Sequence, residues 1–123
     1  MKANIETIVS NIDKSDKPED NDIQRLASRD TVYYIIEESK KIFEKEENLL
    51  KIEGNVIVVG DIHGDILTLS KIFKDNDSKG QIFLFLGNII NQGKYSLESL
   101  VYLLAKKCAN PDKIFILRGN HET

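Results

Sequence analysis

An aspartate and a histidine stand two residues apart in a short polar segment flanked by glycines, Gly60-Asp61-Ile62-His63-Gly64. In an extended loop alternate side chains point the same way, so the Asp61 carboxylate and the His63 imidazole can converge on one cation. Mixed oxygen and nitrogen ligands suit Mn, Fe, Zn or Co better than Ca. Taken alone, such a pair more often makes an ordinary hydrogen bond within a loop than a metal site.

Two further polar segments resemble the first in their placement, at residues 87–93 (GNIINQG) and 118–123 (RGNHET). Each of the three follows an apolar run, and these runs are Val56–Val59, Ile82–Leu86 and Ile114–Leu117. Unbroken apolar runs of this length are typical of parallel strands that are buried on both faces. Ligands of parallel α/β sheets bind beyond the carboxyl ends of the strands. We therefore expect five side chains to converge at one sheet edge, those of Asp61, His63, Asn88, Asn120 and His121.

Helical patterns separate these runs. One pattern passes through Ile66, Leu69, Ile72 and Phe73, and the other has Leu97, Leu100, Val101, Leu104 and Cys108 on one face. Pro111 ends the second pattern. Residues 51–123 therefore predict a βαβαβ unit with parallel strands and right-handed crossovers.

Residues 1–50 predict helices. Ile5, Ile8, Val9 and Ile12 recur at helical spacing, and so do Val32, Ile35, Ile36, Ser39, Ile42 and Phe43. Either Asp30 or Ser28 is a suitable cap for the second helix. The charged stretch Asp13–Asp22 between the two patterns predicts a loop. We expect a single α/β domain over residues 1–123.

Composition excludes several classes of protein. The net charge is −3 and the Lys and Arg residues form no basic stripe, so nucleic acid is not an expected partner. No apolar run approaches the roughly 20 residues of a membrane-spanning helix, and the N-terminus has no signal-peptide pattern. The one cysteine, Cys108, lies in an apolar helical pattern and predicts a core thiol rather than a nucleophile. These features predict an intracellular protein, cytoplasmic or nuclear, without membrane association.

The three polar segments together resemble the motifs of the phosphoprotein phosphatases, the serine/threonine phosphatases among the calcineurin-like metallophosphoesterases. Residues 60–64 are similar to the first motif, and residues 118–122 are similar to the third. Residues 85–93 occupy the place of the middle motif, Gly-Asp-x-Val-Asp-Arg-Gly. The similarity extends from about Thr31 to Thr123. It implies a partial metallophosphoesterase fold and metal-dependent hydrolysis of phosphate monoesters on protein serine and threonine.

The resemblance implies a role for each matching residue. Asp61 and His63 correspond to ligands of a first metal ion, and Asn120 corresponds to a ligand of a second. Asn88 stands at the position of the carboxylate that bridges both metals. His121 corresponds to the general acid that protonates the leaving oxygen. The family's two metals share a hydroxide that attacks phosphorus.

Three positions depart from the family pattern. Asn88 and Asn91 stand where the family has aspartates, and Gln92 stands where an arginine grips the phosphate. A carboxamide is neutral and offers only one coordinating oxygen, so the second metal should suffer most. The sequence also ends before the family's later metal-binding histidines. We expect at most one occupied site, holding Mn, Fe or Zn, and uncovered apolar surface around Ile114–Leu117.

Three interpretations follow from this pattern. The chain is an active phosphatase, or a pseudophosphatase that binds a phosphoprotein or other protein partner, or a fragment of a longer gene product. We favour a truncated, catalytically impaired relative, with the pseudophosphatase binding module as the alternative. Nothing in the sequence indicates an oligomeric state.

Overall fold

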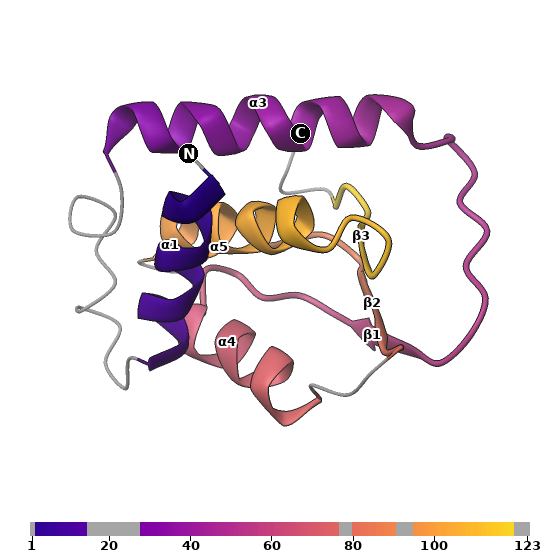
Figure 1. Cartoon of the computed structure of the whole chain (residues 1–123). Coiled ribbons are helices and arrows are strands. Elements are labelled where there is room, and N and C mark those ends of the chain that lie inside the picture. The colour runs from indigo at the N-terminus through magenta and orange to yellow at the C-terminus, as the bar shows by residue number, and fades with distance from the viewer. Residues whose placement is uncertain (1, 15–27, 77–79, 91–94, 120–123) are drawn as a thin grey trace.

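A computed structural model of the chain describes residues 2–14, 28–76, 80–90 and 95–119. Helices and strands alternate after two N-terminal helices (Figure 1). In chain order they are α1 (Lys2–Lys14), α3 (Arg29–Lys45), β1 (Val56–Val59), α4 (Ile66–Asp75), β2 (Ile82–Phe85), α5 (Ser96–Ala109) and β3 (Ile114–Ile116). The predicted fold class, N-terminal helices followed by a βαβαβ unit, is confirmed.

The three strands form one parallel sheet in the order β1-β2-β3. Val56 of β1 pairs with Ile82 of β2, and Phe83 of β2 pairs with Ile114 of β3. The helices α4 and α5 connect successive strands and lie on the same side of the sheet (Figure 1). Both connections return the chain to the same end of the sheet, so the three strands point the same way.

Local side chains determine where two helices begin. The Ser28 hydroxyl accepts a hydrogen bond from the Thr31 amide at 3.2 Å, so Ser28 rather than Asp30 caps α3. The Asp65 carboxylate does the same for the Thr68 amide, also at 3.2 Å, at the start of α4. The capped start of α4 follows directly on the first polar segment, so the cap fixes where that segment ends.

The hydrophobic core fills the space between the sheet and the helices. Phe73 of α4 packs against Phe83 and Phe85 of β2, with ring centroids 4.8 and 5.6 Å apart. Tyr102 of α5 meets the same Phe73 ring edge-on at 5.9 Å. Helices α1 and α3 pack on α5 from outside and extend this core through Ile8, Ile12 and Ile35.

The opposite face of the sheet is open among the described residues, and here one prediction is wrong. The apolar runs were expected to be buried on both faces, yet the side chains of Val58, Leu86 and Leu117 are 59%, 44% and 41% exposed. Periodicity reports the apolar character of a run but not the presence of a covering layer. The expectation of uncovered apolar surface beside β3 agrees with this exposure.

Burial in helix α5 does not follow the single apolar face of its sequence pattern. Leu97, which the sequence pattern groups with four other apolar residues on one face, is 49% exposed, whereas Val101, Tyr102 and Leu103 are all buried in succession. The physical reason is that α5 contacts α1, α3, α4 and β3, so almost its whole circumference is covered. A helix buried on most sides has no single apolar stripe for a pattern to detect.

Helix α3 has an exposed charged face, made of Glu37, Lys40, Lys41, Glu44 and Lys45. Helix α1 extends through Asp13 and Lys14, the first residues of the loop predicted for Asp13–Asp22, and the rest of that loop lies outside the described residues. No helix in the described ranges is long and apolar enough to cross a membrane.

Candidate metal-binding edge

The first polar segment brings its two chemically active side chains together. Nε2 of His63 lies 3.2 Å from Oδ2 of Asp61, directly beyond the end of β1. Their side chains are 28% and 52% exposed, so solvent and ligands reach both. His63 adopts the left-handed region with φ of 50°, an uncommon conformation that turns its ring back towards the aspartate.

The second polar segment meets the first through Asn88, which follows β2. The Asn88 side-chain amide donates a hydrogen bond to Oδ1 of Asp61 at 3.0 Å. The Asp61 carboxylate therefore lies between an imidazole on one oxygen and a carboxamide on the other. Asn88 also adopts the left-handed region, with φ of 54°, which asparagine tolerates better than most residues.

Main-chain hydrogen bonds hold these two segments together independently of their side chains. The carbonyl oxygen of Asn88 accepts from the amides of Ile62 and His63, at 3.1 and 3.0 Å. The carbonyl oxygen of Ile89 accepts from the Gly64 amide at 2.7 Å. The arrangement of Asp61, His63 and position 88 is thus set by the backbone, and it does not require asparagine at position 88.

The third polar segment approaches through a contact between glycines. A Cβ atom built on Gly87 would lie 2.2 Å from the Gly119 nitrogen. A Cβ atom on Gly119 would lie 2.4 Å from Oδ1 and 2.5 Å from the main-chain nitrogen of Asn88. Only residues without side chains allow such an approach. The sequence shows the glycines of each segment but not this contact, because the contact joins residues 32 positions apart.

The structure brings Asp61, His63 and Asn88 together, while Asn120, His121, Asn91 and Gln92 lie outside the described residues. No group of three or more His, Cys, Asp or Glu side chains arranged for a metal occurs within the described ranges.

The chemistry of the donors fits a single transition-metal ion. The Asp61 and His63 atoms that face each other are an anionic oxygen and an imidazole nitrogen, both accessible, and the Asn88 oxygen belongs to a third possible donor. Oxygen and nitrogen donors of this kind favour Mn, Fe or Zn over Ca. Asp61 and His63 would hold such a cation between them in place of their hydrogen bond.

Cys108 does not have the surroundings of a nucleophile. Burial raises the pKa of its thiol, and the negative charge of Glu38 raises it further. Its Sγ lies 3.8 Å from the Ile35 carbonyl oxygen, between α5 and α3. A raised thiol pKa disfavours the thiolate, which is the reactive form.

Comparison with known proteins places this edge in a family context. The profile of the calcineurin-like phosphoesterase domain matches residues 54–123. The chain is 38% identical over 100 residues to the serine/threonine-protein phosphatase 4 catalytic subunit of Candida glabrata, a match covering 80% of this chain and 32% of the relative. It is 36% identical over 95 residues to the corresponding subunit of Eremothecium gossypii, covering 76% and 31%.

A third relative is the serine/threonine-protein phosphatase 2B catalytic subunit A1 of Saccharomyces cerevisiae. The identity is 38% over 96 residues, covering 77% of this chain and 17% of the relative. This chain therefore matches at most about a third of the length of these curated relatives.

Proposed function

Because this chain belongs to the calcineurin-like phosphoesterase family and is related to serine/threonine protein phosphatase catalytic subunits, we propose that it is a catalytically impaired member. It retains part of one metal site and lacks the charge needed for two. The observation that carries this proposal is the hydrogen bond from the Asn88 amide to Oδ1 of Asp61.

In that hydrogen bond the Asn88 side chain points an N–H donor at Asp61, whereas two bound cations would need an oxygen ligand from position 88. An Asn88 amide that donates to Asp61 occupies one carboxylate oxygen and contributes no negative charge. Two divalent ions a few ångströms apart repel each other strongly, and an anionic bridge offsets that repulsion. With a neutral amide at position 88, the second cation loses its main source of stabilisation.

A single cation remains compatible with Asp61 and His63, and we propose Mn, Fe or Zn for this position. A cation there would supply positive charge beside a phosphate oxygen. The role of His121 as the general acid stays a prediction, and so does the role of Asn120 as a ligand of the second metal.

The substrate class follows from the relatives, which are protein phosphatases by name. We propose that the sheet edge with Asp61, His63 and Asn88 binds phosphoserine or phosphothreonine in a protein partner. The alternative is a pseudophosphatase that binds such a partner without any turnover, and the exposed, positively charged Arg118 side chain favours it. A single cysteine in 123 residues supports an intracellular location, since it provides no internal disulfide.

Two measurements test the proposal together. Calorimetric titration with Mn²⁺ should give no more than one weak site per chain. Hydrolysis of para-nitrophenyl phosphate and of a phosphopeptide, with Mn²⁺ present, should not exceed that of the Asp61→Asn variant. Phosphopeptide binding without turnover would support the pseudophosphatase alternative.

Restoring single family residues should not rescue the activity. The substitutions Asn88→Asp, Asn91→Asp and Gln92→Arg act on one transition state, so each repair made alone should gain little. The proposal of a catalytically impaired protein would be overturned by two tightly bound metal ions per native chain. It would also be overturned by turnover that Asp61→Asn and His121→Ala both abolish.

A further inference from the structure

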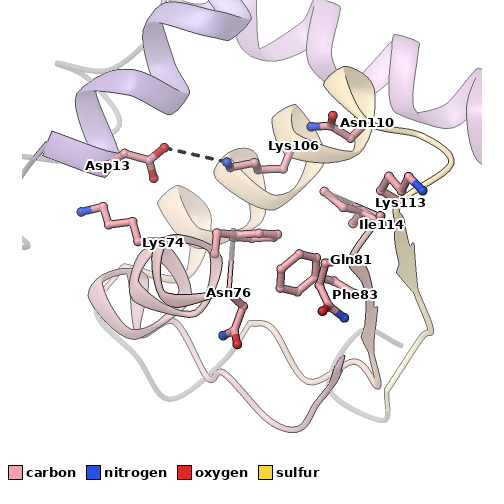
Figure 2. Close-up of a pocket in the computed structure, with 11 residues that line it drawn as sticks. Asp13, Lys74, Asn76, Gln81, Phe83, Lys106, Asn110, Lys113 and Ile114 are labelled. Carbon is pink, nitrogen blue, oxygen red and sulfur yellow. Dashed lines mark ion pairs between the residues drawn. The ribbon is translucent and has the colours of Figure 1, made fainter. Parts of the chain in front are cut away.

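A cavity of about 310 Å³ lies at the sheet edge opposite the candidate metal-binding edge (Figure 2). Its walls come from the C-terminal ends of α1, α4 and α5 and from the residues that precede β2 and β3. The volume lies at the lower end of the range of small-molecule sites. No role in the proposed phosphatase chemistry involves these residues.

The Lys106 ammonium is the central polar group of this cavity. The Lys106 side chain is only 19% exposed, and its Nζ lies 3.8 Å from Oδ2 of Asp13 and 4.9 Å from the centre of the Phe73 ring. A separation of 3.8 Å is an ion pair but not a hydrogen bond. The ammonium makes no hydrogen bond to any described residue, so its N–H donors remain available in a largely buried setting.

Asp13 leaves that ammonium only partly compensated. Its Oδ1 accepts hydrogen bonds from the Tyr102 hydroxyl at 2.6 Å and the Ser70 hydroxyl at 3.1 Å. Two donors therefore already stabilise the carboxylate charge from its other side. Buried charges are costly without hydrogen bonds, so a ligand oxygen at Lys106 would be favourable.

Acceptor atoms line another part of the cavity. The Asn76 amide nitrogen donates to the Ile72 carbonyl at 2.8 Å, and the Gln81 amide nitrogen donates to the Asn55 carbonyl at 2.9 Å. With each nitrogen held by a carbonyl of the main chain, the oxygens of Asn76 and Gln81 remain as acceptors. Acceptors of this kind suit hydroxyl groups.

Positive charge surrounds the opening. Lys74 and Lys113 line the rim with exposed side chains, and their ammonium ends point outward in Figure 2. Together with Lys106 they give the lining three positive charges, and Asp13 gives it one negative charge, so its net charge is +2. Basic side chains at helix ends often only compensate the helix dipole, but Lys113 follows the end of α5 and belongs to no helix.

We propose that this cavity binds a small phosphorylated polyol, such as a sugar phosphate. The Lys106 ammonium and the Asn110 side-chain amide, one helical turn apart, bind the phosphate. Oδ2 of Asp13, which accepts no hydrogen bond from the described residues but pairs with Lys106, and the oxygens of Asn76 and Gln81 accept hydrogen bonds from hydroxyls. Lys74 and Lys113 turn inward over the ligand on their flexible stems and neutralise its second negative charge.

The test is calorimetric titration of the full chain with glucose 6-phosphate, inorganic phosphate and glucose. Each titration is run in EDTA at matched ionic strength, so that no metal-bound phosphate contributes. Glucose 6-phosphate should bind with a Kd below about 1 mM, and the other two at least tenfold more weakly. The Lys106→Met and Asn110→Ala variants should each raise this Kd at least fivefold.

The matched controls lie elsewhere on the molecule. Lys40→Met removes an exposed lysine of α3, and Asp61→Asn alters the opposite sheet edge, so both should retain native affinity. Thermal unfolding of each variant identifies any that fail to fold, and Asn110→Ala keeps the test decisive if Lys106→Met does. The proposal is overturned by an absence of saturable binding, by equal affinity for inorganic phosphate, or by equal weakening in Lys40→Met.

Discussion

The ammonium of Lys107, with no exposed surface, lies 2.5 Å from Oε2 of Glu46 and joins the end of α5 to the residue that follows α3. The same nitrogen donates to the carbonyl oxygens of Pro111 at 2.8 Å and Ile114 at 2.5 Å. All three ammonium hydrogens are thereby used. One buried lysine links a helix, a turn and a strand of the sheet.

Replacing Lys107 should therefore be strongly destabilising. Lys107→Met leaves the Glu46 carboxylate and two carbonyl oxygens without their donor, and breaking one side of a buried ion pair costs roughly 3–5 kcal/mol. Urea unfolding followed by circular dichroism measures the loss. Lys41→Met is the control, because Lys41 pairs with Glu38 on the exposed face of α3 and should change stability by less than about 1 kcal/mol. Equal unfolding midpoints for the two variants would contradict this role.

The Asn88→Asp substitution should have opposite effects with and without metal. In metal-free buffer it replaces a donor to Asp61 with a second carboxylate and should lower stability by about 1 kcal/mol, because both groups are partly solvated. With Mn²⁺ present the paired carboxylates should raise the unfolding temperature above that of the native chain. The backbone hydrogen bonds at Asn88 hold position 88 in place in either case. Asn48→Asp, an exposed change in the segment before β1, should show neither effect, and a metal-independent result for Asn88→Asp would refute the prediction.

The contact between Gly119 and Asn88 predicts a sharp difference between two glycine substitutions. Gly119→Ala places a methyl group 2.4–2.5 Å from atoms of Asn88, including its main-chain nitrogen, so the two loops must separate at a cost of about 1–3 kcal/mol. Gly60→Ala meets nothing within 4 Å and should be tolerated. Thermal unfolding measures the stability of both. In the Asn88→Asp background, Gly119→Ala should also weaken Mn²⁺ binding at least tenfold, whereas Gly60→Ala should not. Equal behaviour of the two variants would show that the loops do not depend on this contact.

Tyr102 should make stability fall in alkaline solution. Burial, then the hydrogen bond and charge of Asp13, raise the pKa of Tyr102 well above its usual range. Above about pH 10 the unfolded chain releases this phenolic proton while the folded chain keeps it, so stability falls as pH rises, by about 1.4 kcal/mol per pH unit. Tyr102→Phe removes this slope, although it is less stable at neutral pH because Asp13 loses a donor. Urea unfolding between pH 8 and 11 gives the slopes, and the exposed Tyr33→Phe serves as control. Parallel pH profiles for the native chain and Tyr102→Phe would contradict the assignment.

Local sequence determined most of the secondary structure of this protein. The run Val56–Val59 is β1 without change, and the other two runs contain β2 and β3 with one extra residue each. Ser28 and Asp65 cap helices within a few residues of themselves. Strand propensity and capping act over a handful of neighbouring residues, so a sequence pattern contains nearly all the information they need.

The sequence also predicted that polar segments at strand ends would meet. A parallel topology alone requires the ends of β1 and β2 to share an edge, and Asp61, His63 and Asn88 lie within hydrogen-bonding distance there. The sequence could not predict which side chains contact each oxygen of Asp61. Those contacts depend on the left-handed conformations of His63 and Asn88 and on main-chain hydrogen bonds between the two loops.

Only the tertiary structure decided which apolar and charged side chains are buried. Val58 is exposed although its run is wholly apolar, and Lys107 is fully buried although it is charged. Whether each side chain is buried depends on groups distant in sequence. Val58 would need a covering layer on its face of the sheet, and Lys107 is buried because Glu46 and the Ile114 carbonyl accept its hydrogen bonds. Likewise, the cavity around Lys106 exists because α1 brings Asp13 to a residue 93 positions later in the chain. Burial is a property of three-dimensional neighbours, and periodicity reports only the neighbours along one helix or strand.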